Sequence, residues 1–449
     1  MKNYLAIMMV LATGLSFTSC KKDANSNSDF ANRSTSAADY SQSSLPVVAV
    51  SGDITTSTTW TAGNVYELSG IVTVKSGATL TIQAGTYIKS TVNTVGGAAN
   101  GVLVIAKDGA INATGTSTNP IVFTSRNLLD GNASTVGKPG DFGGVILLGN
   151  AIINVASRDK LIEGLPDQPQ FHYGGTNDTD NRGTFKYVRI EFAGFQLAPN
   201  VEVNGLTLGG VGSGTTIDHV QTSYGLDDGF EFFGGNVSPK YLVSLASDDD
   251  QFDFDNGYTG SIQYAIAVAD AYSTHSGTGS PVTSDSNGLE SDNNAPAEDA
   301  TFSLSPKTHP ILSNFSIVGT SAATLSPVIT APGFKYGIRE RRGSEVTLNN
   351  SLITGYPSGL VFDADASATP SIINNISVHG FTAATTVTTG AYTAAGTNLT
   401  STAAAAPTWG MSQPFYNSGT VNFLAASGTK GAITTGSGNW VSGWTKFTF

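Results

Sequence analysis

Acidic residues that recur at a regular spacing are the part of this sequence that could do chemistry. Residues 227–235 align with residues 249–257, 22 positions later, so that acid falls on acid and Phe on Phe. Residues 288–292 and 337–341 continue the series at larger offsets. A repeat in the low twenties is the length of one coil of a solenoid, so equivalent positions are expected to stack, and larger offsets indicate inserted loops.

The alternation of side chains along a strand places the repeated acids on one face. If the phenylalanines that flank Glu231 point inward, Glu231 points outward, and Asp253 and Glu290 follow the same parity. Two unit charges about 4.8 Å apart repel by roughly 1 kcal/mol in water and about 3 to 4 kcal/mol at an effective dielectric of 20. The column therefore requires a cation, either Arg339 at the next aligned position or a bound Ca²⁺, and the sequence permits both.

The rest of the sequence predicts the elements that would position this column. From Leu45 onward, short runs rich in Val, Ile, Thr, Phe and Tyr alternate with Gly, Asn, Asp and Ser, without a convincing helical period. Asn349-Asn350 recurs as Asn374-Asn375, 25 positions later, which predicts stacked asparagine ladders. Three short strands per coil favour an all-β parallel β-helix over a propeller or a sandwich, which would need hairpin signals at each turn.

Several segments resemble coils of right-handed β-helix proteins of the pectin-lyase-like type. They are residues 70–86, 115–125, 143–147 and 187–191, with Gly443-Trp444 near the end of the chain. Together they are similar to a group of uncharacterised outer-membrane lipoproteins of Bacteroidota-type bacteria. The resemblance implies an all-β, right-handed parallel β-helix with inserted loops and capped ends. We expect the four tryptophans, Trp60, Trp409, Trp440 and Trp444, to seal the terminal coils.

The acid column also resembles the active-site face of β-helix polysaccharide lyases, in which acids on successive coils hold calcium and a basic residue removes a proton. By that resemblance, Arg339 or Arg341 is the candidate catalytic base. The candidate metal ligands are Glu231, Asp253, Asp255, Glu290 and Asp292. The short signatures of pectate lyases and polygalacturonases are missing from the sequence. A structural alternative is that the aspartates of 227–228 and 248–250 cap turns and that Glu231 to Arg339 is an ion ladder.

The amino terminus has the pattern of a lipoprotein signal. Residues 1–19 carry Lys2, an apolar stretch and then small residues, directly before Cys20, the single cysteine. This resembles a lipobox, although Phe17 departs from the usual Leu. We therefore predict a signal peptide at 1–19, a lipidated Cys20 with a flexible tether at 20–44, and a β-helix domain at 45–449. The expected location is the outer membrane, anchored by lipid and exposed at the surface.

The charge balance excludes one class of partner. With 22 basic and 34 acidic residues, the net charge is −12, which opposes binding along a phosphate backbone. Nucleic acid is therefore not expected as a partner, and protein partners remain unknown. The sequence favours a protein that binds an extended ligand such as a polysaccharide. The alternatives are a calcium-dependent polysaccharide lyase or glycoside hydrolase, and a purely structural surface protein.

Overall fold

The computed structural model describes residues 40–92, 101–194, 196–198, 201–269, 286–319, 334–367, 370–395, 400–402 and 428–447. The predicted signal peptide, Cys20, Trp409 and most of the predicted tether lie outside these residues. Tyr40, which we had assigned to the tether, is buried and its hydroxyl donates to Glu191 Oε2 at 2.5 Å. The folded domain therefore includes residues 40–44. Within the described residues, no helix is both long and apolar enough to cross a bilayer.

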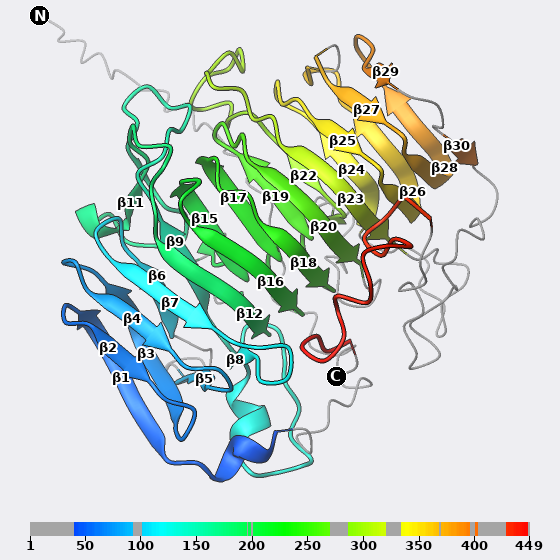
Figure 1. The fold of residues 1–449 in the computed structure, drawn as a ribbon. Coiled ribbons are helices and arrows are strands. Elements are labelled where there is room, and N and C mark those ends of the chain that lie inside the picture. The colour runs from blue at the N-terminus through cyan, green and yellow to red at the C-terminus, as the bar shows by residue number, and fades with distance from the viewer. Residues whose placement is uncertain are drawn as a thin grey trace, which may run out of the picture.

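The strands stack into one long right-handed parallel β-helix, which confirms the predicted fold class (Figure 1). Each coil runs through three faces in the order face 1, face 2, face 3. Face 1 contains β6 (Val102–Ile105), β9 (Gly144–Leu148), β15 (Leu206–Val211), β17 (Phe230–Gly235), β19 (Phe252–Asp255), β22 (Glu290–Ser291) and β24 (Phe334–Glu340). The short strand β21 (Ser286–Asn287) pairs with the start of β24. Face 2 contains β2 (Thr58–Trp60), β4 (Thr79–Ile82), β7 (Ala110–Thr114), β25 (Thr347–Asn349), β27 (Ile372–Asn374) and β29 (Thr393–Ala395). Face 3 contains β5 (Tyr87–Ser90), β8 (Ile121–Phe123) and β30 (Thr400–Thr402).

Longer strands turn a corner between two faces. From face 2 to face 3 run β12 (Gly183–Glu191), β16 (Thr216–Ser223), β18 (Lys240–Leu245), β20 (Ser261–Val268) and β23 (Ile311–Val318). From face 3 to face 1 run β1 (Val47–Ile54), β3 (Val65–Val74), β26 (Leu352–Phe362) and β28 (Ser377–Val387). Outside the stack lie the hairpins β10 (Lys160–Leu161) with β11 (His172–Tyr173) and β13 (Gln196–Ala198) with β14 (Val201–Glu202), and the 3-10 turns η3 (Ser41–Ser44), η4 (Arg126–Leu129) and η5 (Pro169–Phe171).

The interior of the solenoid is filled by residues that repeat from coil to coil. Phe230 stacks on Phe252 with ring centroids 5.0 Å apart, and Phe232 stacks on Phe254 at 5.1 Å. All four rings are fully buried. The Phe-on-Phe alignment predicted from the 22-residue repeat is therefore confirmed, and it fixes the acids between these phenylalanines on the outer side of the strand.

A column of residues with left-handed backbone forms the corner between faces 2 and 3. Its members, from coil to coil, are Tyr187, His219, Tyr241, Tyr264, Asn314, Asn350 and Asn375, each with a φ between 48° and 61°. The predicted asparagine ladder lies in this column, where Asn375 Nδ2 donates to Asn350 Oδ1 at 2.7 Å. Asparagine suits the position because its short polar side chain tolerates positive φ. The aromatic members stack face to face, so their rings support one another.

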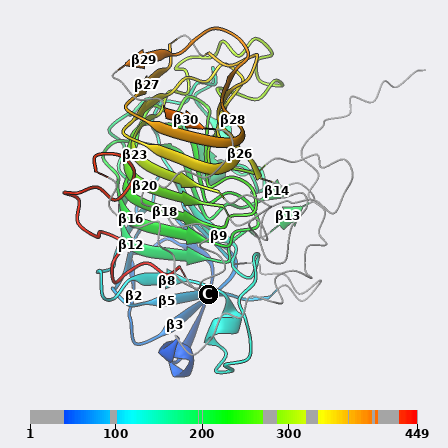
Figure 2. The same ribbon diagram turned by 90° about the vertical axis from the view of Figure 1, so that its right-hand side faces the viewer.

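The C-terminal segment 428–447 packs along the flank of the helix (Figures 1 and 2). Trp444 and Val441 pack in one apolar cluster with Val243 and Ile266 of face 3. The expectation that Trp440 and Trp444 seal the end of the fold is therefore wrong. Those outward valine and isoleucine side chains need a cover, and the indoles provide it. Trp60, in contrast, is buried in the first coil and stacks on Tyr66 at 4.9 Å, as expected.

One carboxyl group points into the core. Strand pairing places Glu340 between Ser291 and Phe362, on the inward side of face 1. The side chain is fully buried, Ser344 Oγ donates to Oε2 at 2.9 Å, and Oε1 has no hydrogen-bond partner among the described residues. Burial raises the pKa of Glu340 from 4.5 to about 8, so the carboxyl is neutral in the native protein below that pH.

The Glu340 carboxyl should make the protein less stable as pH rises. The native state keeps this proton up to about pH 8, whereas the unfolded chain loses it near 4.5, so the free energy of unfolding falls through this window. At 1.36 kcal/mol per pKa unit, the loss is about 5 kcal/mol at most. Glu340→Gln cannot ionise and should show a smaller decline in thermal melts between the two pKa values. Equal slopes for the two proteins would contradict this assignment.

Candidate functional site

The acids and the arginine that were predicted to stack lie in register on the outer side of face 1. Strand pairing sets Glu231 beside Asp253, and Asp253 beside Glu290. The column continues with Thr207 before the acids and with Arg339 after them. The predicted alignment of this column is therefore confirmed. Glu231 and Glu290 are not solvated, however, because each is only 6% exposed.

A second column of Asn and Asp runs beside the first, three residues earlier in each strand. The backbone amide of Asp228 donates to Asn204 Oδ1 at 3.1 Å, and that of Asp250 donates to Asp228 Oδ1 at 2.8 Å. The amide of Asn287 in turn donates to Asp250 Oδ1 at 2.6 Å. Each side chain thus satisfies a backbone amide of the next coil. The structural alternative for the aspartates is confirmed for Asp228 and Asp250, but only one oxygen of each carboxylate makes this bond.

The two columns together form a carboxylate cluster. Three overlapping groups have ligand oxygens within 4.8 Å of one another: Asp227, Asp228 and Asp249; Asp228, Glu231 and Asp253; and Asp250, Asp253 and Glu290. Burial raises the pKa values of Asp228, Glu231, Asp250 and Asp253 well above their ordinary range, and repulsion from neighbouring carboxylates raises them further. These acids therefore hold their protons to a higher pH than solvated carboxyls do.

Arginines compensate one end of the cluster. Arg341 contacts Glu290 and donates from Nε to Asp292 Oδ1 at 2.7 Å. Arg342 reaches Asp292 at 2.6 Å, and Arg339 Nη1 lies 3.4 Å from Glu290 Oε2. Two predicted metal ligands, Glu290 and Asp292, are thus already ion-paired. The carboxylates of Glu290 and Asp292 also raise the pKa of Arg341, which keeps its guanidinium protonated.

The other end of the cluster has no such partner. Among the described residues, no lysine or arginine forms an ion pair with Asp228, Glu231 or Asp253. In the described part of the chain, Asp253 Oδ1 is buried without a hydrogen-bond partner. There, Glu231 Oε2 accepts a hydrogen bond from the side-chain amide of Asn204 alone. These three carboxylates offer oxygen ligands alone, without histidine or cysteine, which is the donor set of a hard cation such as Ca²⁺.

Asp255, the remaining predicted ligand, lies at the edge of the cluster. Burial raises the pKa of its carboxyl to about 7, against the opposing effect of the Lys160 ammonium. Its Oδ1 accepts from the backbone amide of Asn256 at 2.5 Å. Asp255 thus lies beside the carboxylate cluster, and its carboxyl titrates near neutral pH.

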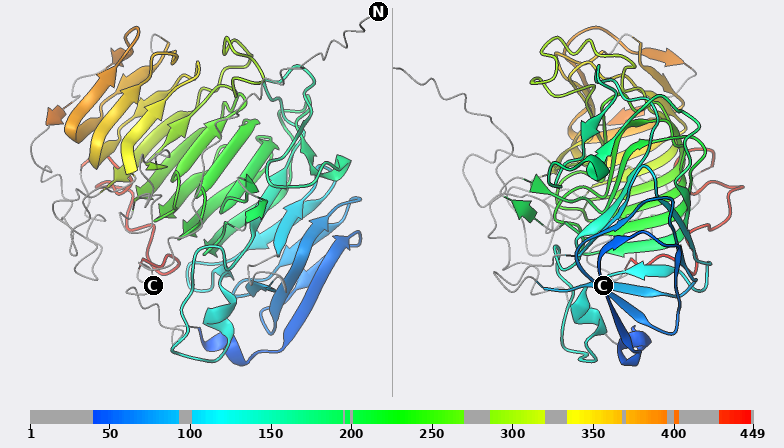
Figure 3. Two further views of the ribbon diagram at one scale, coloured as in Figure 1. Left: turned by 180° about the vertical axis from the view of Figure 1, so that it is seen from behind. Right: turned by 90° about the vertical axis from the view of Figure 1, so that its left-hand side faces the viewer.

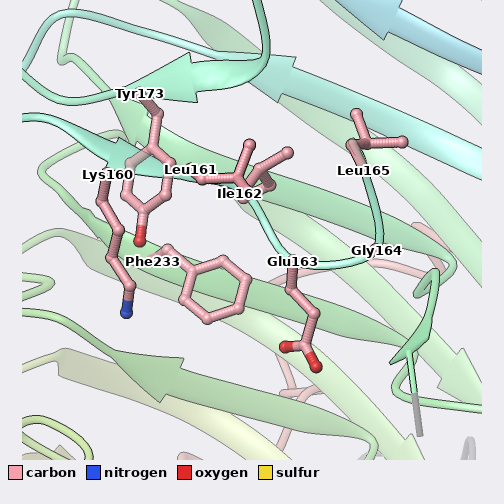
Figure 4. Close-up of a pocket in the computed structure, with 8 residues that line it drawn as sticks. All are labelled: Lys160, Leu161, Ile162, Glu163, Gly164, Leu165, Tyr173 and Phe233. Atoms are coloured by element: carbon pink, nitrogen blue, oxygen red, sulfur yellow. The ribbon is translucent and has the colours of Figure 1, made fainter. Parts of the chain in front are cut away.

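An insertion, residues 149–182, covers part of face 1. It contains the β10–β11 hairpin and lies on the outside of the stacked strands (Figure 3). Ile162, Leu165 and Tyr173 pack on Ile146 and Phe233 of face 1 in one apolar cluster. Between the insertion and strand β17 lies a pocket of about 400 Å³ (Figure 4). Its lining residues are Lys160, Leu161, Ile162, Glu163, Gly164, Leu165, Tyr173 and Phe233.

His172 forms hydrogen bonds within this insertion. His172 Nδ1 lies 2.7 Å from Asp159 Oδ2, and Nε2 lies 3.0 Å from Asp167 Oδ1. Hydrogen bonding to the two carboxylates raises the pKa of His172, and Asp159 is also paired with Lys107 at 2.9 Å. The next residue, Lys160, pairs with Glu298 at 2.5 Å. The pairs Lys107–Asp159 and Lys160–Glu298 therefore connect the insertion to residues outside it.

Several site residues were missed in the sequence. Asn204 and Asn287 each precede a column position by three residues, and Asn204-Gly205 matches Asp228-Gly229, so the repeat contained a usable signal. No sequence signal marked Glu163 and Lys160, because they belong to an insertion that does not repeat. Only the folded chain brings Glu163 close enough to Glu231 for the two charges to repel.

Comparison with protein families supports this architecture. A family model described as a pectate-lyase-like beta helix domain matches residues 52–445. The chain belongs to this family. The match spans nearly the whole described β-helix of this pectate-lyase-like protein, including both columns and the covering insertion. Searches of curated proteins and of solved structures found no match.

Removing Arg341 should destabilise the pectate-lyase-like domain most at neutral pH. Arg341→Met removes the closest ion-pair partner of Glu290 and leaves Asp292 with Arg342, and breaking a buried pair costs roughly 3 to 5 kcal/mol. At acid pH the carboxylates take up protons, so the cost should shrink. Urea unfolding at both pH values, with the exposed Lys240→Met as control, measures it. A cost independent of pH would contradict the ion ladder.

Proposed function

We propose that this protein is a surface-exposed β-helix protein of the outer membrane, lipid-anchored through Cys20, that binds an extended polysaccharide along face 1. Ca²⁺ between Asp228, Glu231 and Asp253 is part of the proposal. The observation that carries it is the group of three close carboxylates with no ion-pair partner among the described residues. The family match to a pectate-lyase-like domain supports a ligand of the polysaccharide class.

The residues present fit a calcium ion. Ca²⁺ takes six to eight oxygen ligands from carboxylates, carbonyls and water, and the three carboxylates supply the charged part of such a set. Asp253 Oδ1 is a buried oxygen without a hydrogen-bond donor, which a cation would satisfy. When bound, the ion would offset the clustered charge and offer open coordination positions to sugar oxygens. Asp228 Oδ1 accepts from the backbone amide of Asp250, which leaves Oδ2 outside that bond.

Binding is better supported than catalysis. A base that abstracts a proton must first lose its own, and the pairing of Arg341 with Glu290 and Asp292 favours its protonated form. The catalytic role of Arg339 or Arg341 stays a prediction. Phe233 and Tyr173 lie beside the acids, but both are buried in the apolar cluster beneath the insertion.

A calcium-dependent lyase remains the second candidate because the arginines directly contact the acids, as that chemistry would need. A purely structural surface protein is the third candidate. The three candidates differ in what they do to a glycan: a binder retains it, a lyase cleaves it to unsaturated products, and a structural protein ignores it. One glycan panel, tested with calcium and with chelator, separates them.

Calcium should increase both glycan binding and thermal stability of the wild type. It should increase neither in Asp253→Asn. An ion that binds only the folded state stabilises it by about 2.7 kcal/mol at a hundredfold excess over its dissociation constant. The panel is read for retained glycan and for unsaturated products, alongside thermal melts. Asp130→Asn, at an exposed acid on a distant loop, is the matched control. Glycan binding that ignores calcium in all three proteins would refute the metal site.

The anchor is tested separately from the site. Cys20→Ser removes the thiol that lipidation requires, so the protein should leave the membrane fraction of the cell. Fractionation followed by detergent extraction measures this. Retention of Cys20→Ser as an integral membrane component would show that something other than a lipid on Cys20 holds the protein.

A further inference from the structure

Three side chains from separate parts of the chain meet at the start of the β10–β11 hairpin. Lys160 Nζ lies 2.5 Å from Glu298 Oε1 and donates to Asn256 Oδ1 at 2.7 Å. The Asn256 side-chain amide in turn donates from Nδ2 to Glu298 Oε2 at 3.3 Å. One carboxyl group therefore contacts both an amine and a carboxamide. This is the arrangement that acyl transfer from the carboxamide to the amine requires.

The carboxamide of Asn256 is polarised by its surroundings. Asn256 is fully buried, and its Oδ1 accepts a second hydrogen bond from the hydroxyl of the buried Tyr173 at 2.8 Å. Figure 4 shows this hydroxyl and the Lys160 amine pointing in the same direction. Two donors on one carbonyl oxygen draw electrons away from Cγ, and a fixed donor stabilises the oxyanion that forms when an amine attacks. Burial also excludes water, which would compete as the nucleophile.

A second lysine makes similar contacts without these features. Lys75 Nζ donates to a carboxamide, Gln170 Oε1, at 2.6 Å and pairs with Asp53 Oδ2 at 2.5 Å. The Gln170 amide, however, donates to the side chain of Gln168, and the Asp53 side chain is 40% exposed. Lys75 therefore provides a comparison within the same chain, in which an amine, an amide and an acid meet near the surface.

We propose that Lys160 and Asn256 react to form an intramolecular isopeptide bond, with Glu298 as the proton shuttle. Glu298 takes a proton from the Lys160 ammonium, and the neutral Nζ forms a bond to Asn256 Cγ. The bond from Cγ to Nδ2 then breaks. Of the three protons on the ammonium, one stays on the new amide, and Glu298 passes the other two to Nδ2. That nitrogen leaves as ammonium, and Glu298 ends as the carboxylate that it was at the start.

The bond ties the insertion 149–182 to the turn after β19, 96 residues further along the chain. A disulfide cannot do this, because Cys20 is the single cysteine. A covalent link that closes so long a loop restricts the unfolded chain and thereby stabilises the folded one. It holds the insertion on face 1 whether or not a glycan or calcium is bound, so the inference does not depend on the proposed function.

Protease digestion of the purified full-length protein, followed by tandem mass spectrometry, tests this. We expect one branched peptide that contains Lys160 and Asn256 and lacks the mass of one ammonia molecule. Lys160→Arg keeps the positive charge but should give two separate, unmodified peptides and a lower melting temperature. Glu298→Gln should also give separate peptides, because the shuttle is lost. Lys75→Arg is the matched control and should leave the branched peptide unchanged.

The wild type alone can overturn the proposal, if the folded protein yields only unlinked peptides. An ammonia loss at Asn256 that persists in Lys160→Arg also overturns it, because the side chain would then have cyclised onto the backbone amide of Gly257. The structure favours the lysine as nucleophile, since that amide already donates to Thr308 Oγ1 at 2.9 Å. A branched peptide that still forms in Glu298→Gln refutes the shuttle. A folded Glu298→Gln protein without the branched peptide supports it.

Discussion

In-register stacking of parallel coils is the constraint on which the rest of this structure depends. Neighbouring strands lie about 4.8 Å apart, so whatever occupies a position in one coil meets its equivalent in the next at that distance. Phenylalanines gain from this arrangement, as the pairs Phe230–Phe252 and Phe232–Phe254 show. Carboxylates do not, because the same geometry that stacks the rings also forces Glu231 against Asp253.

The outer side of face 1 changes character along the helix as a result. After Asp53 and Thr73 the column becomes apolar at Val104 and Ile146. It then passes through Thr207 to the acids and continues to Arg339. The insertion 149–182 covers the apolar part, since exposed apolar surface is costly in water. The pocket lies between this insertion and Phe233 of face 1, where apolar side chains meet Lys160 and Glu163.

Burial makes the carboxylate cluster responsive to protons as well as to cations. A carboxyl removed from water and surrounded by like charges holds its proton to a higher pH, and both effects act on Asp228, Glu231 and Asp253. Protons and a bound cation would therefore compete for the same carboxylates. At the other end of the cluster, Arg341 already pairs with Glu290 and Asp292.

The repeat can be read directly from the sequence, and its alternation predicts which side chains point inward and which point outward. It placed Glu231, Asp253, Glu290 and Arg339 in one outward column and stacked Asn350 with Asn375, because strand register is set by a local pattern of period two within each coil. The same parity puts Glu340 inside. Tertiary structure decided what covers the coils. The approach of Glu163 to Glu231 and the packing of Trp444 on face 3 involve segments without a repeat, whose positions are set by the apolar surface they bury and by no periodic signal.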